Sequence, residues 1–492
     1  MRIALVNPMA RRSEGYHRIG SFIPELGLQV LAEMVPAPHE VDIIDEVFDA
    51  TASDKYITPG RYDLVGLTAY TSGATRAYEI AGRCRSLGIP TIIGGPHVSA
   101  MPEEAAEHFD SVAVGECDEI WPGIIADADA GTLKKRYQGG LPELRSGIGR
   151  AAQQAQPING TYSVSCIQTS RGCPVGCEYC SVTQFNGAPI RRRPIPEVVE
   201  EWFETPKPFL FVVDDNFFGV GEEHAKWAKE LLRAIIREQK IRRKKKLWFS
   251  QTTINMGDDP EGLALAYKAG CRGMMVGFET FNRKNLEEYH KGINKKNLDR
   301  YPDLIRGFHR QGVSVFGGFI IGAEQDDQDT VADTAELAIS AGVDIIQITN
   351  LTPLPGTKMY DRFVEQGRIF ALNYPEDWER YSFVETVYRP SRMTAGQLDE
   401  AIYELRYLAA KMPWVWGRTL KTLWRTRSWQ TALFVHGMNI GFKRMARIQT
   451  PRDEERFGFT PNGSERTRRM RQAFRFFTGR PVKTLASAES SA

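Results

Sequence analysis

The stretch Arg171-Gly172-Cys173-Pro174-Val175-Gly176-Cys177-Glu178-Tyr179-Cys180 holds three of the seven cysteines of the chain, at the spacing C-x3-C-x2-C. The other four stand singly. A structural zinc site normally takes four protein ligands from paired short loops, and no second C-x2-C or H-x3-H pair follows. In a [4Fe-4S] cluster each thiolate binds one iron, so three cysteines leave the fourth iron open. The motif therefore favours such a cluster over the alternatives, a zinc loop or three unrelated thiols.

The composition is that of a globular chain with several domains. Its 492 residues exceed one ordinary domain, and 42% are hydrophobic and 25% charged. The net charge of +2 gives no general affinity for nucleic acid. The chain begins without a signal-peptide pattern, and no apolar run is long enough for a membrane span. We therefore expect a cytoplasmic protein, where thiols stay reduced.

Residues 1–135 alternate short apolar strands with helical patterns, which predicts a doubly wound α/β domain with a parallel sheet. Such sheets bind ligands outside the carboxyl ends of their strands. Small residues in those loops would let a bulky ligand approach the backbone, although a glycine after a strand is often only a tight turn. The candidate contacts in these loops are Pro8, Thr71, Ser72, Gly73, Gly94, Gly95, Pro96, His97, Gly115 and Glu116.

Residues 136–162 are rich in Gly, Pro and Gln and are predicted to be a linker. From 163 to 360 the strand–helix alternation resumes, with about six units, which predicts a partial (β/α)6 barrel. Active sites of such barrels lie at the strand carboxyl ends. The candidate residues there are Asp214, Asp215, Asn216, Gln251, Glu279, Gly318, Ile320 and Gly322. For the D-D-N run, a solvated acidic turn is the alternative.

Residues 361–484 lose the strand pattern and become aromatic and basic, as in Met412-Pro413-Trp414-Val415-Trp416-Gly417-Arg418. We expect a mostly helical extension. Aromatic and basic residues at helical spacing are typical of a helix at a membrane surface, and also of a helix packed on its own protein. Both interpretations, peripheral membrane contact and internal packing, stay open. Residues 485–492 are predicted to be disordered.

The cysteine stretch resembles the radical S-adenosylmethionine (SAM) signature, including an aromatic residue, Tyr179, directly before the last cysteine. The resemblance implies that Cys173, Cys177 and Cys180 hold a catalytic [4Fe-4S] cluster whose free iron binds SAM. It implies that Tyr179 approaches the adenine and that Glu279 contacts the ribose or amino acid part of SAM. It also assigns SAM contacts to Asp214, Asp215, Asn216 and Gln251, and to the segment containing Gly318, Ile320 and Gly322.

An α/β domain directly before such a barrel is similar to the cobalamin-binding domain of cobalamin-dependent radical SAM enzymes. The D-x-H-x-x-G motif is absent, because the loop after the first strand is Asn7-Pro8-Met9-Ala10-Arg11-Arg12. The resemblance thus implies cobalamin at the strand ends named above, without that lower histidine ligand. His17 and His97 are candidate contacts, with a surface or turn histidine as the alternative for each.

The family resemblance implies a reaction in which a 5'-deoxyadenosyl radical activates a carbon and methylcobalamin methylates it, in a cavity between the two domains. We expect a C-methyltransferase for a small hydrophobic substrate such as a lipid or isoprenoid. An electron donor such as flavodoxin or ferredoxin would reduce the cluster. Two alternatives stay open, a cobalamin-linked oxidative cyclase and a non-catalytic cobalamin or SAM sensor.

Overall fold

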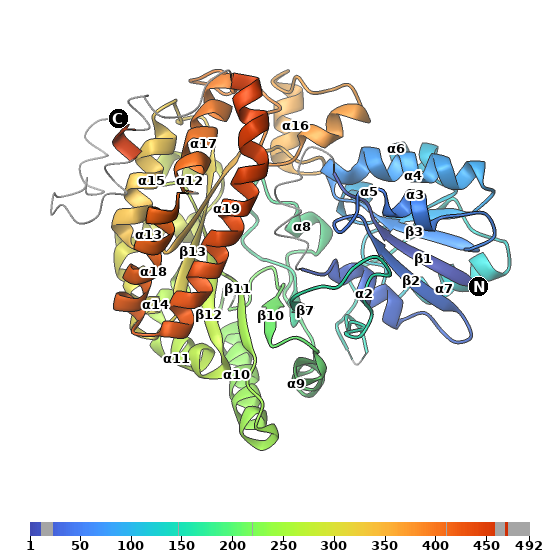
Figure 1. The fold of residues 1–492 in the computed structure, drawn as a ribbon, viewed down its shortest axis with the longest axis horizontal. Helices are drawn as coiled ribbons and strands as arrows, with labels where there is room; N and C mark the ends of the chain where they lie inside the picture. The colour runs from blue at the N-terminus through green and yellow to red at the C-terminus, as the bar shows by residue number, and fades with distance from the viewer. Residues whose placement is uncertain (11–22, 146, 219, 410, 458–467, 471–492) are drawn as a thin grey trace.

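The computed structural model describes residues 1–10, 23–145, 147–218, 220–409, 411–457 and 468–470 (Figure 1). His17, a candidate cobalamin contact, and the tail 485–492, predicted to be disordered, lie outside these residues. Two lobes face each other, the N-terminal α/β domain and the barrel, with the cysteine loop and helix α8 (Val182–Phe185) between them.

The N-terminal sheet is entirely parallel, with the strand order β2-β1-β3-β4-β5-β6. Helices cover both faces, as predicted for a doubly wound domain. The strands are β1 (Arg2–Asn7), β2 (Glu40–Asp45), β3 (Leu64–Thr68), β4 (Thr91–Gly94), β5 (Ser111–Val114) and β6 (Arg136–Gln138). One face packs on α2 (Leu26–Glu33) and α7 (Trp121–Asp129). The other packs on α3 (Ala52–Tyr56), α4 (Ala74–Ser86), α5 (Pro96–Ala100) and α6 (Pro102–His108).

Alternate side chains of the β1 strand explain the two layers. Ala4 and Val6 belong to the cluster under α4, whereas Ile3 and Leu5 belong to the cluster under α2 and α7. Because side chains alternate across a strand, a sheet buried on both faces needs apolar residues at nearly every position. This is why the strands of the domain are continuous apolar runs.

The second sheet also has six parallel strands, and their order, β14-β13-β12-β11-β10-β7, follows the chain. It is the predicted partial barrel. The strands are β7 (Ser165–Ile167), β10 (Phe209–Val212), β11 (Leu247–Thr252), β12 (Cys271–Glu279), β13 (Ser314–Ile321) and β14 (Ile345–Asn350). The connecting helices include α9 (Ile195–Glu204), α10 (Glu222–Arg242), α11 (Pro260–Ala269), α12 (Arg283–Glu288), α13 (Gly292–Asn297), α14 (Tyr301–Arg310) and α15 (Thr330–Ala341).

The short strands β8 (Ser170–Arg171) and β9 (Arg191–Arg192) pair antiparallel and join the two ends of the cysteine loop. Gly172 directly follows β8 with φ +96°, and a Cβ there would overlap the carbonyl oxygen of Pro189. Only glycine suits this position, because the φ is left-handed and the space is filled by backbone. The chain therefore enters the cysteine loop through a fixed turn.

The C-terminal extension is mostly helical, as predicted, and it contacts both lobes. Its helices are α16 (Lys358–Glu365), η5 (Glu376–Arg380), α17 (Ala395–Ala409), α18 (Met412–Thr426) and α19 (Trp429–Phe457). Trp378 of η5 donates to Glu104 of the first domain at 2.8 Å. Phe434 of α19 stacks on Phe209 and contacts Phe249, with its ring tilted by 38°, on the barrel strands. In Figure 1, α19 runs across β12 and β13. None of the described helices is long and apolar enough to cross a membrane.

Candidate active site between the two sheets

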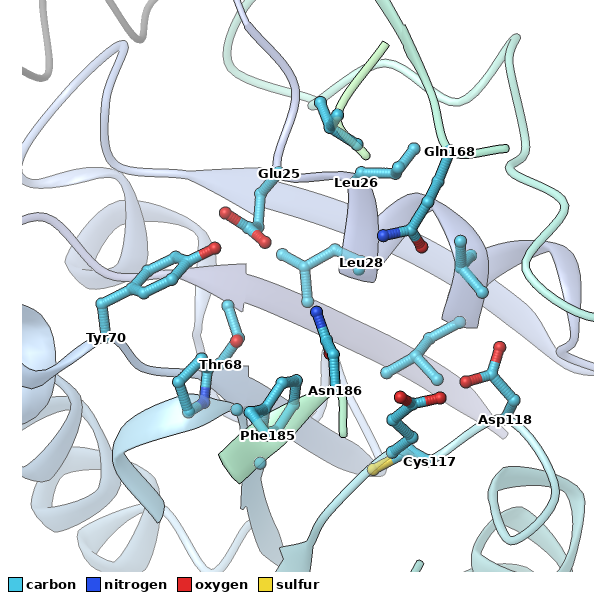
Figure 2. Close-up of a pocket in the computed structure, with 18 of the residues that line it drawn as sticks. Glu25, Leu26, Leu28, Thr68, Tyr70, Cys117, Asp118, Gln168, Phe185 and Asn186 are labelled. Atoms are coloured by element: carbon cyan, nitrogen blue, oxygen red, sulfur yellow. The ribbon is translucent and has the colours of Figure 1, made fainter. Parts of the chain in front are cut away.

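A cavity of about 500 Å³ lies where the two sheets point their strand ends at each other (Figure 2). The N-terminal domain contributes Thr68 and Tyr70 after β3 and Gly94 to Pro96 after β4. The barrel side contributes residues at or after the ends of β7, β10 and β11, including Asp215 and Gln251. It also contributes four residues in and beside α8, which are Ser181, Val182, Phe185 and Asn186. The predicted position of the active site, between the two domains, therefore coincides with this cavity.

One limb of the cavity runs into the N-terminal domain between the sheet and its helices. Its wall is apolar and consists of Leu5, Leu28, Leu31, Gly66, Ile92, Ala113 and Trp121. Gly66 lies within β3, and a Cβ there would come within 3.1 Å of Leu5 Cδ2. This limb, the apolar slot, and the polar lining residues beside it, such as Glu116 and Asp118, are compatible with cobalamin.

Five of the ten predicted cobalamin contacts line the cavity. They are Gly94, Gly95, Pro96, Gly115 and Glu116. Gly95 has φ +103°, and a Cβ there would lie 2.8 Å from Thr68 Oγ1, so the turn requires glycine. The remaining predicted contacts, apart from His97, lie nearby without lining the cavity, and they are Pro8, Thr71, Ser72 and Gly73. Tyr70, at the start of the loop that contains Thr71, Ser72 and Gly73, does line it.

The structure corrects the prediction for His97. Its side chain is fully buried on the side away from the cavity, 3.2 Å from the Tyr78 hydroxyl and with its ring against Trp378 of the extension. Glu104 accepts hydrogen bonds from both Tyr78 and Trp378. His97 is the second residue of the short helix α5. It therefore belongs to the packing between the first domain and the extension.

The three motif cysteines lie half-buried in one loop between the sheets. Burial raises the pKa of the Cys180 thiol to about 12 and also raises the pKa values of Cys173 and Cys177, while nearby Lys291 acts in the opposite direction on all three. Iron binds the thiolate, so cluster formation would release these protons. Each of the three thiols therefore lies close enough to Lys291 to be affected by its charge.

Among the described residues, no group of three or more His, Cys, Asp or Glu side chains is arranged to hold a single metal ion. A single ion such as zinc would need its ligands to converge on one point. A [4Fe-4S] cluster needs no such convergence, because each thiolate binds a different iron. The cysteine loop is compatible with the cluster that the motif predicts.

An ion pair that the sequence analysis missed lies beside the cysteines. Lys291 Nζ is 2.6 Å from Glu279 Oε1 and 3.4 Å from the Tyr179 hydroxyl. Burial alone would lower the pKa of Lys291, but Glu279 and Cys177 outweigh burial and raise it above its ordinary value. Glu279 ends β12 with φ +67°, and Gly277 leaves room for the pair, because a Cβ there would overlap Glu279. The predicted SAM contacts Glu279 and Tyr179 are therefore joined by one buried cation.

The residues of the D-D-N run have different surroundings. Asp214 is fully buried and accepts from Thr169 N at 2.6 Å and from Ser170 Oγ at 3.0 Å, and burial raises its pKa to about 6. It fixes the turn between β7 and β8, so the prediction of a SAM contact is corrected. Asp215 lines the cavity and accepts from Gly172 N at 2.8 Å, which ties it to the cysteine loop. Asn216 is buried, and its carbonyl faces His224.

The end of β13 is also corrected in part. A Cβ on Gly322, whose φ is +119°, would overlap the Tyr388 hydroxyl, and that hydroxyl donates to Gly322 O at 2.5 Å. The glycine therefore accommodates a tyrosine of the extension rather than an adenine. Gly318 faces Met275, and Ile320 is half-buried against the core of the first domain and extension.

A buried network of four charges joins the two domains. Arg171, one residue before Gly172, binds Glu116 at 2.7 Å and Asp118 at 2.6 Å and 3.0 Å. Arg191 of β9 also pairs with Glu116. All four side chains are at most 11% exposed, so removing one partner would strand a buried charge, a change that costs about 3–5 kcal/mol. The predicted contact Glu116 thus lines the cavity while holding the cysteine loop against the first domain.

The fold and the site define a class of protein, an enzyme in which a cobalamin-type α/β domain faces a cysteine loop for an iron–sulfur cluster. Arg171, Ser181 and Val182 at the two ends of that loop line the cavity, whereas the three cysteines themselves are not among its lining residues. Comparison with known proteins agrees. The radical SAM superfamily model matches residues 167–362, and the B12 binding domain model matches residues 16–125. The chain belongs to the cobalamin-dependent radical SAM enzymes, whose cofactors are a [4Fe-4S] cluster, SAM and cobalamin.

Curated relatives cover most of the chain. The bacteriochlorophyllide d C-8(2)-methyltransferase of Chlorobaculum tepidum is 29% identical over 388 residues, covering 75% of this chain and 81% of the relative. The hopanoid C-2 methylase of Rhodopseudomonas palustris is 27% identical, covering 71% of this chain and 66% of the relative.

Two solved enzymes share the fold. The radical SAM methyltransferase TsrM from Kitasatospora setae superposes with a TM-score of 0.61 at 19% identity, covering 74% of this chain and 76% of that one. The cobalamin-dependent radical SAM enzyme OxsB superposes with a TM-score of 0.61 at 13% identity, covering 96% and 83%.

Proposed function

We propose that the protein is a C-methyltransferase that methylates an unactivated carbon of a small substrate with a large apolar surface. The proposal rests on one cavity that is lined both by the strand ends of the cobalamin-binding domain and by residues next to the cluster loop. Relatives named as bacteriochlorophyllide d methyltransferases and a hopanoid methylase support it.

The chain offers a separate place for each group. Cys173, Cys177 and Cys180 would hold the cluster, and the Lys291–Glu279 pair and Asp215 lie where they could contact SAM. The apolar slot and the glycines after β4 would hold cobalamin. When bound, these groups supply hydrogen abstraction by a SAM-derived radical and a transferable methyl group.

The residues of the chamber itself would bind the substrate and keep water out. Leu26, Phe185 and Phe211 supply apolar surface, and Glu25 and Tyr70 face each other at one end (Figure 2). Burial, and then the nearby Asp45, raise the pKa of Glu25 to about 7. A carboxyl group that is partly protonated near neutral pH can hold or accept a proton from a bound substrate.

A labelling experiment tests the methyl transfer. Anaerobically reconstituted protein is incubated with reductant, SAM carrying a deuterated methyl group, and extracts or pure candidates of the bacteriochlorophyllide and hopanoid types. The proposal predicts 5'-deoxyadenosine and a product that carries the label. Release of 5'-deoxyadenosine with an unlabelled, ring-closed product would instead identify an oxidative cyclase. No release with any candidate, from protein with full cluster content, would identify a sensor.

We further infer that a small reduced protein of the flavodoxin or ferredoxin type supplies the electron, in the cytoplasm. The cysteine loop lies between the lobes, so the donor would approach at their junction. Photoreduced flavodoxin should support 5'-deoxyadenosine formation at a rate that saturates with its concentration. A rate that depends only on a chemical reductant would contradict the inference.

A further inference from the structure

Helix α18 exposes its large apolar residues and buries its small polar ones. A helix on a globular protein normally turns an apolar stripe toward the core. The buried residues of α18 are Val415, Thr419, Thr422 and Thr426. The exposed ones are Trp416, Leu420, Leu423 and Trp424, with exposed fractions of 52%, 55%, 40% and 80%. The exposed four follow the spacing i, i+4, i+7, i+8, so they form one continuous apolar stripe facing solvent.

Hydrogen bonds fix α18 in this orientation. Thr422 Oγ1 donates to Asp344 Oδ1 at 2.7 Å, and Asp344 is buried and also accepts from Val315 N. Arg425 Nη1 donates to Gly342 O at 3.0 Å. Rolling the helix to bury its tryptophans would break these bonds and leave the carboxylate of Asp344 short of a donor, which is costly in a protein interior. These hydrogen bonds therefore hold α18 with its apolar stripe toward solvent.

The stripe continues onto the next helix. After a turn with Arg427 at φ +51°, α19 begins with Trp429 and Leu433, which are 64% and 57% exposed and one helical turn apart. Helices α18 and α19 pack side by side. We call the six exposed residues the α18–α19 face, and they are Trp416, Leu420, Leu423, Trp424, Trp429 and Leu433.

The charge around the α18–α19 face has one sign. Residues 412–446 contain six basic side chains and no Asp or Glu, in a chain whose 63 basic and 61 acidic residues nearly balance. The six are Arg418, Lys421, Arg425, Arg427, Lys443 and Arg444. Burial lowers the pKa of Lys421 to about 7, and Arg418 and Arg425 donate to the carbonyl oxygens of Ala409 and Gly342, so Arg427, Lys443 and Arg444 carry most of the charge offered to a partner. A segment with basic side chains and no acidic ones favours an anionic partner. Two copies of the chain paired through this face would instead bring like charges together.

We propose that the α18–α19 face docks on an anionic lipid surface. Tryptophan suits the headgroup level, because one edge of its ring is apolar and its N–H can bond to water or lipid oxygen. Lysine and arginine beside it gain about 1 kcal/mol each from an anionic leaflet. The face would lie on the membrane without crossing it, which agrees with the helices of the described chain. The inference does not depend on the proposed methyl transfer.

A vesicle experiment on the full-length holoenzyme tests the proposal. The protein is sedimented with vesicles of phosphatidylcholine, with and without phosphatidylglycerol. We expect binding to the anionic vesicles only, weakening as salt is added. The double variant Trp416→Gln/Trp424→Gln should bind about tenfold more weakly or worse, because it removes the two largest apolar side chains of the face. The matched control Ile241→Gln/Leu372→Gln replaces two residues that are 72% and 53% exposed elsewhere and should bind like the natural chain.

Other outcomes would overturn the proposal. They are equal binding to neutral vesicles, absence of salt dependence, and undiminished binding by the tryptophan double variant. Light scattering forms a second arm. A dimer that forms with rising concentration, and is lost in the tryptophan variant, would assign the face to a second copy of the chain. Because both tryptophans are at least half exposed, circular dichroism and thermal midpoints should match those of the natural chain, which separates loss of binding from loss of folding.

Discussion

The strand ends of both parallel sheets point at the same region, but the side chains at these strand ends differ between the two sheets. The strand ends of the N-terminal sheet carry small residues, such as Gly94 and Gly115, and open into an apolar slot. The strand ends of the barrel carry charged side chains already engaged with one another, such as Asp214 with the β7–β8 turn and Glu279 with Lys291. The first wall is therefore suited to recognise its cofactor by shape, and the second by charge and by metal ligation.

The largest expected effect lies on the metal-binding wall. Cys177→Ala should abolish SAM cleavage, with a loss of at least about 10³-fold in 5'-deoxyadenosine formation, because one iron would lose its thiolate. Iron content and 5'-deoxyadenosine are measured after anaerobic reconstitution. Cys84→Ala is the control, since Cys84 is buried in the core of the first domain. An equal loss at Cys84 would contradict the assignment of the cluster.

The charge on the same wall is tested by Lys291→Met. This change leaves Glu279 buried beside the cluster without its cation, and we expect SAM cleavage to fall about 100-fold, equal to about 2.7 kcal/mol. Iron content should stay near that of the natural chain. Lys295→Met is the control, because Lys295 pairs with Glu287 at the surface. If SAM binding by equilibrium dialysis and SAM cleavage both stay unchanged in Lys291→Met, the pair has no part in the site.

The shape of the other wall is tested by Gly94→Val. The nearest atom to a Cβ at Gly94 is 3.5 Å away, so the backbone tolerates a side chain that would project into the cavity. We expect cobalamin affinity, followed by absorption titration, to fall about tenfold while iron content is unchanged. Gly82→Ala on α4 has open space around it and serves as the control. Loss of iron in Gly94→Val would show that the two walls are not independent.

A smaller effect comes from Glu25 at the rim between the walls. Its folded pKa is raised from 4.5 to about 7, so the folded chain holds this proton more tightly than the unfolded chain. The chain should lose stability as pH rises through this window, by up to about 2–3 kcal/mol. In Glu25→Gln that loss should disappear, as measured by urea unfolding of the cofactor-free chain at about pH 5 and about pH 8. Glu143→Gln, at an exposed carboxyl, should keep the slope of the natural chain.

The sequence predicted most of the framework because strands and helices leave local patterns. The runs rich in aromatic and β-branched residues at 209–213, 247–251 and 345–349 form β10, β11 and β14 within a residue at each end. The cysteine motif was likewise local. Contacts between distant segments left no such signal. Lys291 meets Glu279 across a helix, Arg171 meets Asp118 across 53 residues, and Tyr388 fills the space beside Gly322 from the extension.

The same limit explains the corrected site residues. Asp214 and Gly322 stand at strand ends, where the family pattern places SAM contacts, yet the chain itself supplies their partners. A position at a strand end shows that a side chain can reach the site, but not whether another part of the chain has already occupied it. The orientation of α18, with its apolar stripe toward solvent, could not be predicted from the sequence for a related reason. Its periodicity fits both a stripe packed on the protein and a stripe exposed to solvent.

The central claim is that the cluster and cobalamin share one cavity, and electron paramagnetic resonance tests it most directly. The protein is loaded with cob(II)alamin, reduced so that the cluster is also paramagnetic, and compared with samples in which only one centre carries an unpaired electron. If the two centres share one cavity, each signal should broaden or split when both centres are paramagnetic. Two signals that simply add, in protein with full iron and cobalt content, would contradict it.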